Sequence, residues 1–418
     1  YKDNPAFLKG KRLEEHHGYS FFFTQAEKQK YCNLKGVYAL LDSPDKLSGS
    51  SLTPVVYVCE AENEVEAGKI HQRVWNQNIV PFLLVVTPKN IRLYSGFEYD
   101  LNKNDENRVL EVAKNAKEVL SKLSAFKSEA IDSGDIWKQQ KISTEKRVDR
   151  HLLGNLKKLA EILTGKKYNL PMEYTHSLIG KYIYLKYLRD RDILSDERFE
   201  KAKNNVDSIF GSDANQTKLY ELEEYLNNFL NGSVFPLPGI NNIRAEHIKK
   251  VAGVFKGDDP ESNQQVLFNM YDFSCIPIET LSVVYQQFLH QKGEGKEKGA
   301  YYTPVVLVNF ILDELDAKKP LKEGMKVFDP SCGSGAFLVQ CYRRLIESII
   351  RGKRAKLNPT DLRKLLVDHI FGLDADKEAC QVAELSLSLT LLDYIEPHDL
   401  RTYPTFRLPN LHNKNIFH

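Results

Sequence analysis

The stretch "VFDPSCGSGAF", residues 327–337, combines a short apolar strand pattern with an acid, a proline and a glycine-rich turn. A buried strand that enters a helix through such a turn is typical of the first unit of a doubly wound parallel sheet. Gly333 and Gly335 permit backbone angles closed to other residues and let a ligand approach the main chain. The free amides of the next helix face the same space. We therefore expect a cofactor site at the carboxyl end of this strand.

Asp329 indicates which kind of cofactor the turn would bind. Its charge at the strand end would repel a pyrophosphate, and the run Gly-Ser-Gly-Ala-Phe lacks the GxGxxG spacing of dinucleotide sites. S-adenosylmethionine fits better, because it has an ammonium, a sulfonium and a ribose diol but no phosphate. Asp374, in "FGLDAD" (371–376), ends a second predicted strand and could accept both ribose hydroxyls. Alone, Asp329 could initiate a turn and Asp374 could cap a helix, but the ordered pair favours a cofactor site.

Three motifs, "GAYYTP" (299–304), "VFDPSCGSGAFLV" (327–339) and "GLDAD" (372–376), together resemble the adenine-N6 DNA methyltransferases of restriction-modification systems. Their order resembles the gamma class, in which the region before the glycine motif folds over the cofactor. The resemblance covers roughly residues 275–418 and implies a Rossmann-like domain that binds S-adenosylmethionine. The cofactor-binding residues that it implies are Tyr302, Thr303, Pro304, Asp329, Pro330, Ser331, Gly333, Gly335, Phe337 and Asp374.

The catalytic loop of that family has no counterpart in this sequence. The family transfers its methyl group at an Asn/Asp-Pro-Pro-Tyr/Phe loop, which holds the target amine and stacks on the flipped base. The sequence contains no Pro-Pro, and Asn358-Pro359 precedes the acid of the second strand. The final "HNKNIFH" (412–418) resembles the approach to a third cofactor-contacting strand. We therefore expect an incomplete methyltransferase domain, with the catalytic loop and a target-recognition domain in a missing C-terminal part.

The chain divides by pattern into three expected domains. Residues 1–130 alternate short apolar strands with a helix at 63–78, and a further helix at 104–125 is expected to close this α/β domain. Residues 131–290 have helical spacing throughout and resemble the helical spacer of large single-chain restriction enzymes. Residues 291–418 would be the N-terminal part of the methyltransferase domain. The predicted fold class is therefore a multidomain α/β protein with a nuclease-like domain, a helical spacer and a Rossmann-like domain.

The first domain raises the question of DNA cleavage, because restriction enzymes of this type often begin with a metal-dependent nuclease. "YVCEAENE" (57–64) places Glu60 and Glu62 at a strand end, where Asp42 or Asp45 could join them around Mg²⁺. The usual Glu-x-Lys pattern lacks its lysine here. The alternatives are a nuclease-like fold without activity, or acids that are simply solvated. We expect a domain that keeps the fold without cleaving DNA.

Composition bounds the remaining possibilities. The sequence has 58 Lys and Arg against 56 Asp and Glu, a net charge of +2, so any nucleic-acid surface must be a local patch. Residues 138–167 hold nine basic and three acidic residues, which form either a phosphate-contacting stripe or a solvated helix face. Six cysteines without a CxxC pair indicate reduced thiols in the cytoplasm. We expect no signal peptide and no membrane span.

Three functions remain open on this basis. The leading hypothesis is site-specific adenine-N6 methylation of double-stranded DNA in a restriction-modification or related phage-defence system. The second is a bifunctional enzyme that also cleaves DNA through its first domain. The third is a DNA-binding scaffold that has lost catalysis. A Pro-Pro loop in a longer gene would favour methylation, whereas its absence would favour the scaffold.

Overall fold

The computed structural model describes residues 4, 6–14, 18–27, 32–41, 52–100, 103–139, 145–230, 235–256, 271–289, 303–353 and 355–418. The chain forms two compact units. The first unit contains Tyr1–His151 and Thr303–Leu321, and the second contains Leu152–Tyr302 and Lys322–His418. The mixed α/β class predicted from the sequence is confirmed, whereas its division into three domains stays a prediction. No described helix is both long and apolar enough to cross a membrane.

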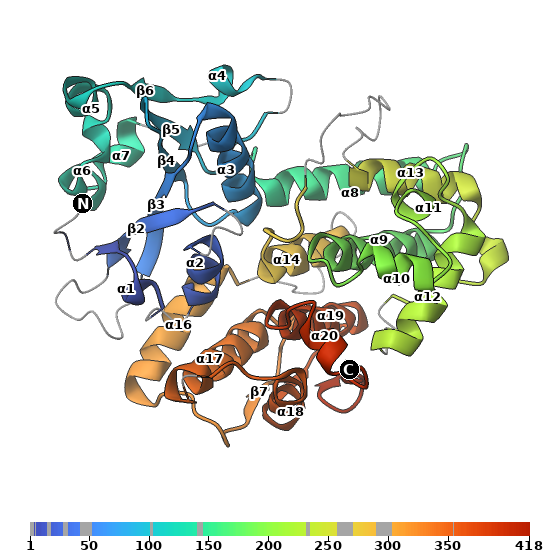
Figure 1. Cartoon of the computed structure of the whole chain (residues 1–418). Coiled ribbons are helices and arrows are strands. Elements are labelled where there is room, and N and C mark those ends of the chain that lie inside the picture. Colours follow the sequence, from blue (N-terminus) through green and yellow to red (C-terminus); the bar gives the residue numbers. More distant parts are fainter. Residues whose placement is uncertain are drawn as a thin grey trace. The chain divides into compact units, whose positions relative to one another are not determined.

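The first unit is built on a six-stranded sheet with the order β1-β2-β3-β4-β5-β6 (Figure 1). Its strands are β1 (Phe7–Leu8), β2 (Leu34–Leu41), β3 (Leu52–Glu60), β4 (Phe82–Val86), β5 (Ile91–Ser95) and β6 (Glu111–Ala113). All neighbouring strands are antiparallel except β3 and β4, which are parallel and are connected through helix α3 (Glu64–Gln77). The predicted strands and the predicted helix at 63–78 are therefore confirmed.

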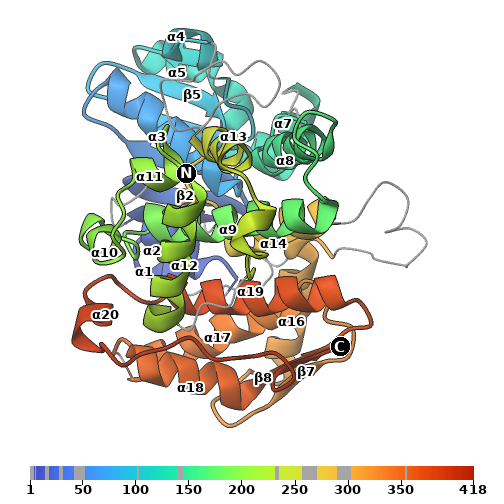
Figure 2. The ribbon, with the colours of Figure 1, turned by 90° about the vertical axis from the view of Figure 1, so that its right-hand side faces the viewer.

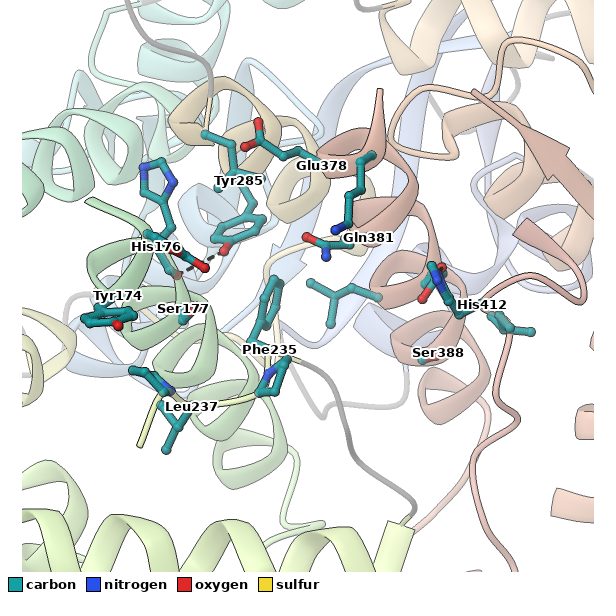
Figure 3. Close-up of a pocket in the computed structure, with 18 of the residues that line it drawn as sticks. Tyr174, His176, Ser177, Phe235, Leu237, Tyr285, Glu378, Gln381, Ser388 and His412 are labelled. Atoms are coloured by element: carbon teal, nitrogen blue, oxygen red, sulfur yellow. Dashed lines mark hydrogen bonds and ion pairs between the residues drawn. The ribbon is translucent and has the colours of Figure 1, made fainter. Parts of the chain in front are cut away.

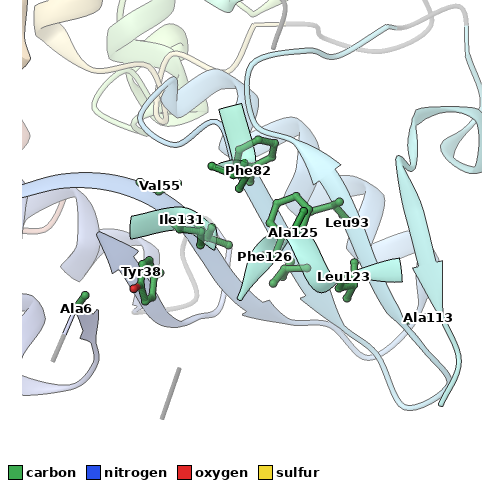
Figure 4. Packing of buried hydrophobic residues seen from close by; sticks show 13 residues of the cluster. Ala6, Tyr38, Val55, Phe82, Leu93, Ala113, Leu123, Ala125, Phe126 and Ile131 are labelled. Carbon is green, nitrogen blue, oxygen red and sulfur yellow. The ribbon is translucent and has the colours of Figure 1, made fainter. Parts of the chain in front are cut away.

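Aromatic and aliphatic side chains of the sheet and of the segment that follows it pack into one buried cluster (Figure 4). Phe82 of β4 meets Phe126 edge to face at 4.9 Å between ring centroids. Nearby, the hydroxyl of Tyr38 on β2 donates to Asp132 at 2.9 Å. Residues 124–139 supply the covering layer as η1 (Ser124–Phe126), α6 (Ser128–Asp132) and α7 (Asp135–Gln139). The sheet thus gains a core from the segment that follows it in the sequence.

The single helix predicted over residues 104–125 is wrong. The structure has α4 (Asp105–Arg108), then strand β6, then α5 (Ala116–Lys122). Asn104 caps α4 and Asn115 caps α5, each by accepting a hydrogen bond from a backbone amide three residues later. Between α4 and α5, strand β6 pairs with β5. Pairing with another strand therefore decides the conformation of a segment whose composition favours a helix.

The described part of residues 152–289 contains helices joined by turns and loops but no strand, as the sequence predicts. The helices are α8 (Val148–Thr164), α9 (Met172–Asp190), α10 (Asp196–Lys201), α11 (Asp207–Phe210), α12 (Gln216–Leu230), η2 (Ile240–Asn242), α13 (Ala245–Lys256) and α14 (Ile278–Leu289). The second unit also holds a parallel sheet with the order β7-β8-β9. Its strands are β7 (Val327–Asp329), β8 (Ile370–Leu373) and β9 (Ile416–Phe417).

Helices α17 (Ala336–Lys353), α18 (Pro359–His369) and α19 (Lys377–Asp393) pack against this sheet (Figure 2). They cover the face that carries Ile370 and Ile416, both of which are buried. The other face carries Phe328, Leu373 and Phe417, which are 59%, 42% and 36% exposed. The expectation that the first strand is buried is therefore wrong for the described residues, because the described helices cover only one face of the sheet.

Candidate cofactor site

The turn between β7 and α17 has the conformation that its sequence predicts. Asp329 ends the strand, and its Oδ1 accepts a hydrogen bond from the Ser331 amide at 3.0 Å. Gly333 and Gly335 follow with φ angles of +52° and +85°, in the left-handed region that favours glycine. The Gly335 amide donates to the Cys332 carbonyl at 2.8 Å, and α17 begins at the next residue. The turn is thus fixed by local hydrogen bonds.

The two glycines differ in what surrounds them. A Cβ at Gly335 would lie 3.2 Å from the Cβ of Ala383 on α19, so this glycine allows the start of α17 to pack closely on α19. A Cβ at Gly333 would instead have Nε2 of Gln286 at 3.9 Å as its nearest described neighbour outside the adjacent residues, at an ordinary van der Waals distance. Gly335 therefore serves packing, whereas Gly333 is less tightly surrounded by the described residues.

Asp374 joins the end of β8 to this turn. Its Oδ2 accepts from the Gly333 amide at 2.8 Å, and its Oδ1 accepts from the Asp376 amide at 2.9 Å. The structure therefore brings together the acid of the second motif and the glycine turn of the first. An ionised carboxylate has about four acceptor sites, so these two bonds leave capacity for two further donors. A vicinal diol such as that of ribose supplies two donors of this kind.

The thiols beside the turn are neutral. Burial, together with nearby Cys380, Asp374 and Asp329, raises the pKa of the Cys332 thiol to about 12. Burial and Asp374 likewise raise the pKa of the Cys380 thiol to about 11. Neither cysteine is a thiolate at neutral pH, so neither provides a nucleophile or an additional negative charge. Asp329 and Asp374 supply the carboxyl groups of the turn, which suit a ligand with a cationic group.

The packing of the turn against β8 also requires a glycine at position 372, which the sequence analysis missed. A Cβ at this position would lie 2.7 Å from Cδ1 of Leu338 and 2.9 Å from Sγ of Cys332. The strand glycine thus makes room for the first turn of α17 and for the turn before it. A glycine inside a strand pattern is itself a signal of such close approach, and it could have been recognised from "FGLDAD".

Helix α14 also contributes side chains that the sequence analysis did not single out. Ser282 of α14 and Ser386 of α19 share a hydrogen bond of 2.6 Å between their hydroxyl oxygens. Glu279 of α14 accepts from Gln340 and Arg343 of α17 at 2.7 and 2.9 Å. The signal was the spacing of polar residues at positions 279, 282 and 286, which lie on one face of an otherwise apolar helix.

The other predicted cofactor residues lie in the turn, in helix α17, in the first unit or outside the described residues. Pro330 and Ser331 are exposed, and Phe337 is half-buried in the first turn of α17. Thr303 and Pro304 belong to the first unit, where Pro304 precedes α16 (Val305–Lys318). Tyr302 lies outside the described residues. The roles assigned to these residues stay predictions.

The nuclease candidates lie in the first unit. Glu60 ends β3 and is exposed, and its carboxylate pairs with Lys35 of β2 at 3.3 Å. Glu62 is also exposed, in the bend before α3, while Asp42 and Asp45 lie outside the described residues. Within the described residues, no group of three His, Cys, Asp or Glu side chains is arranged to hold a metal. Mg²⁺ binding here stays a prediction, and Lys35 is a cation that the sequence pattern did not reveal.

A separate pocket of about 1150 Å³ lies elsewhere in the second unit, lined by parts of α9, α14, α19 and residues 408–412 (Figure 3). Among the residues that line it, the Tyr285 hydroxyl donates to the His176 carbonyl at 3.1 Å, and the His412 ring forms a hydrogen bond of 2.9 Å with the Glu384 carboxylate. Burial raises the pKa of Glu384, and His412 opposes that shift. No predicted cofactor residue is among its described lining, whereas Asp374 and the glycine turn meet at the strand ends.

Comparison with known proteins supports the predicted relation to DNA methylases. Residues 277–418 match the model of the family described as N-6 DNA Methylase. The type I restriction enzyme MjaIX methylase subunit of Methanocaldococcus jannaschii is 34% identical over 34% of this chain and 24% of its own length. The MjaVII methylase subunit of the same organism is 28% identical over 55% of this chain and 43% of its own length. The chain thus spans less than half the length of these curated relatives.

One solved structure, titled "cryoEM structure DrdV-DNA complex", is similar over 92% of this chain and 38% of that chain. Its sequence identity is 14% and its TM-score is 0.30. A score this low does not establish a shared arrangement of domains. The nuclease-like identity of the first domain and the single-chain architecture therefore stay predictions.

Proposed function

We propose that this chain carries the S-adenosylmethionine-binding half of a site-specific DNA adenine-N6 methyltransferase from a restriction-modification or related phage-defence system. The observation that carries the proposal is the meeting of Asp374 with the Gly333 amide at the ends of two parallel strands. The match of residues 277–418 to the N-6 DNA methylase family supports the reaction class. The same match supports DNA as the substrate, and we propose that this DNA is double-stranded.

The residues of the turn bind and orient the cofactor. Asp374 has acceptor capacity for the two ribose hydroxyls, and it is itself held by two backbone amides. Asp329 places a second carboxylate near the cationic part of the ligand. When bound, S-adenosylmethionine supplies the activated methyl group. Because the sequence has no Pro-Pro loop, we propose that a part of the protein outside this sequence binds the target adenine.

Cleavage of DNA is the weaker proposal. Glu60 is paired with Lys35 rather than with further described carboxylates, and this arrangement does not favour a metal site over a solvated ion pair. We therefore keep methylation as the proposed activity and treat cleavage as an alternative. The inactive scaffold remains the alternative for a protein that binds cofactor or DNA without methyl transfer.

Replacing Asp374 tests the cofactor assignment. Asp374→Ala removes the charged acceptor, so we expect binding of S-adenosylhomocysteine to weaken by about 1–3 kcal/mol, measured by titration calorimetry. Asp374→Asn, which keeps one acceptor oxygen, should fall between wild type and Asp374→Ala. Asp368→Ala removes an exposed carboxylate from α18 and serves as the matched control.

Two results would contradict the assignment. The first is tight binding of NAD by the wild-type chain without binding of S-adenosylmethionine or S-adenosylhomocysteine. The second is equal affinity of wild type and Asp374→Ala for S-adenosylhomocysteine. Circular dichroism of each variant checks that a lost affinity does not reflect a lost fold.

A further inference from the structure

Gln286 approaches the glycine turn from a helix outside the three sequence motifs. Its Nε2 lies 3.9 Å from the position that a Cβ of Gly333 would occupy, and apart from Gly333 and its two chain neighbours no other described residue comes within 4 Å of that position. The side chain of Gln286 is half-buried and makes no hydrogen bond within the described part of the chain. A polar amide therefore borders the turn without a hydrogen-bond partner in the described part of the chain.

The helix that carries Gln286 is held firmly in place. One turn earlier, Ser282 bonds to Ser386 of α19, and two turns earlier Glu279 bonds to Arg343 of α17. Positions 279, 282 and 286 share one face of the helix, so the same contacts that fix α14 also direct Gln286 towards the turn. Such support from neighbouring residues is what a precise ligand contact requires.

The charges of the turn indicate which part of the cofactor needs this amide. Asp329 and Asp374 suit the cationic groups and the ribose hydroxyls, but they repel the carboxylate at the methionine end. That carboxylate needs hydrogen-bond donors, and a glutamine amide offers two N–H groups without adding charge. The amides at the start of α17 offer further donors on the same side.

We propose that Gln286 is a cofactor-binding residue, whose amide donates a hydrogen bond to the carboxylate at the amino-acid end of the ligand. The identity of the ligand rests on the proposed function, whereas the contact itself rests on the position of Gln286 beside Gly333. The residue thus extends the cofactor site to α14, which lies ahead of all three motifs in the sequence.

Two ligands that differ at one end test the contact. S-adenosylhomocysteine has the carboxylate, whereas 5′-methylthioadenosine has the same adenosine part without an amino-acid end. We expect Gln286→Ala to weaken binding of S-adenosylhomocysteine by roughly five- to tenfold and to leave 5′-methylthioadenosine within about twofold. Gln286→Glu should weaken S-adenosylhomocysteine further, because its carboxylate would face that of the ligand. Gln287→Ala, a change of the same size at the next half-buried position, is the control and should change neither affinity.

The outcomes separate this inference from the proposed function. If wild type binds S-adenosylhomocysteine and Gln286→Ala binds it equally well, the inference is wrong and the proposed function stands. Equal weakening of both ligands would also overturn the inference, because the contact would not involve the carboxylate. If wild type binds neither S-adenosylmethionine nor S-adenosylhomocysteine, the proposed function and the inference fail together.

Discussion

Removal of Arg343 should destabilise the second unit strongly, because this residue balances buried charge. Its Nε lies 2.9 Å from Glu279, and a second guanidinium nitrogen lies 2.5 Å from Asp393. Arg191 also contacts Asp393, at 2.6 Å. The side chains of Arg343, Glu279 and Asp393 are at most 2% exposed, and that of Arg191 is 8% exposed. Two positive and two negative charges thus form one buried cluster with no net charge.

The magnitude follows from the charge that each variant leaves behind. Arg343→Met leaves two carboxylates with one arginine, and breaking a buried pair in this way costs about 3–5 kcal/mol of unfolding free energy. Adding Glu279→Gln restores the balance, because Arg191 and Asp393 still pair with each other. The double variant should therefore be more stable than Arg343→Met alone, with a coupling energy of about 2 kcal/mol or more.

The two tryptophans make this prediction specific to one unit. Trp75 and Trp137 both lie in the first unit, so tryptophan fluorescence follows the unfolding of that unit during a urea titration. Far-UV circular dichroism also follows the helices of the second unit. We expect Arg343→Met to shift the circular dichroism transition and to leave the fluorescence transition in place. Arg351→Met, on the same helix but only half-buried, is the control.

The reasoning would be refuted by either of two results. If Arg343→Met shifts the transition no more than Arg351→Met does, the buried charges do not stabilise the second unit as argued. If the unfolding free energy of the double variant falls by the sum of the losses in Arg343→Met and Glu279→Gln, the two charges are not coupled.

Two further predictions concern the glycine turn and a buried histidine. Gly335→Ala should lower the stability of the second unit by about 1–3 kcal/mol in the same titration, because it combines a left-handed φ with contact to Ala383. Burial lowers the pKa of His71 to about 4, so as the pH falls below about 6.5 the unfolded chain takes up the proton first. The first unit should therefore lose about 2 kcal/mol between pH 7 and pH 5 by tryptophan fluorescence, and His71→Gln should remove most of that loss.

The parts of the fold that the sequence predicted correctly are those with strong local signals. Helix α3 (Glu64–Gln77) is preceded by the N-cap Asn63, whose side chain accepts from the Glu66 amide, and followed by the C-cap Asn78, whose φ angle is +57°. Both residues are recognisable as caps in the sequence. Strand β6 has only three residues and depends on its pairing with β5, so no local pattern distinguished it from a helix. Its environment, rather than its composition, decides its conformation.

The core of the candidate site was predictable because adjacent parallel strands bring their carboxyl ends together. Once β7 and β8 are recognised as strands, Asp374 is expected beside the turn that contains Gly333, and the hydrogen bond of 2.8 Å is consistent with this. The pairing of Lys35 with Glu60 was not predictable in the same way, because it depends on the register of two antiparallel strands. A register shift of one residue would place the lysine on the opposite face.

The helical region and the region that contains the glycine turn form one unit because their contact surface resembles a protein core. Interfaces between separate domains are usually polar and partly solvated. Here Arg343 of α17 and Glu279 of α14 pair at full burial, and Ser282 bonds to Ser386 between α14 and α19. The helix that follows the glycine turn is therefore fixed by a helix that the sequence pattern assigned to a spacer. The match to the N-6 DNA methylase family begins at residue 277 and so includes α14, which is consistent with counting this helix together with the glycine turn rather than with a spacer.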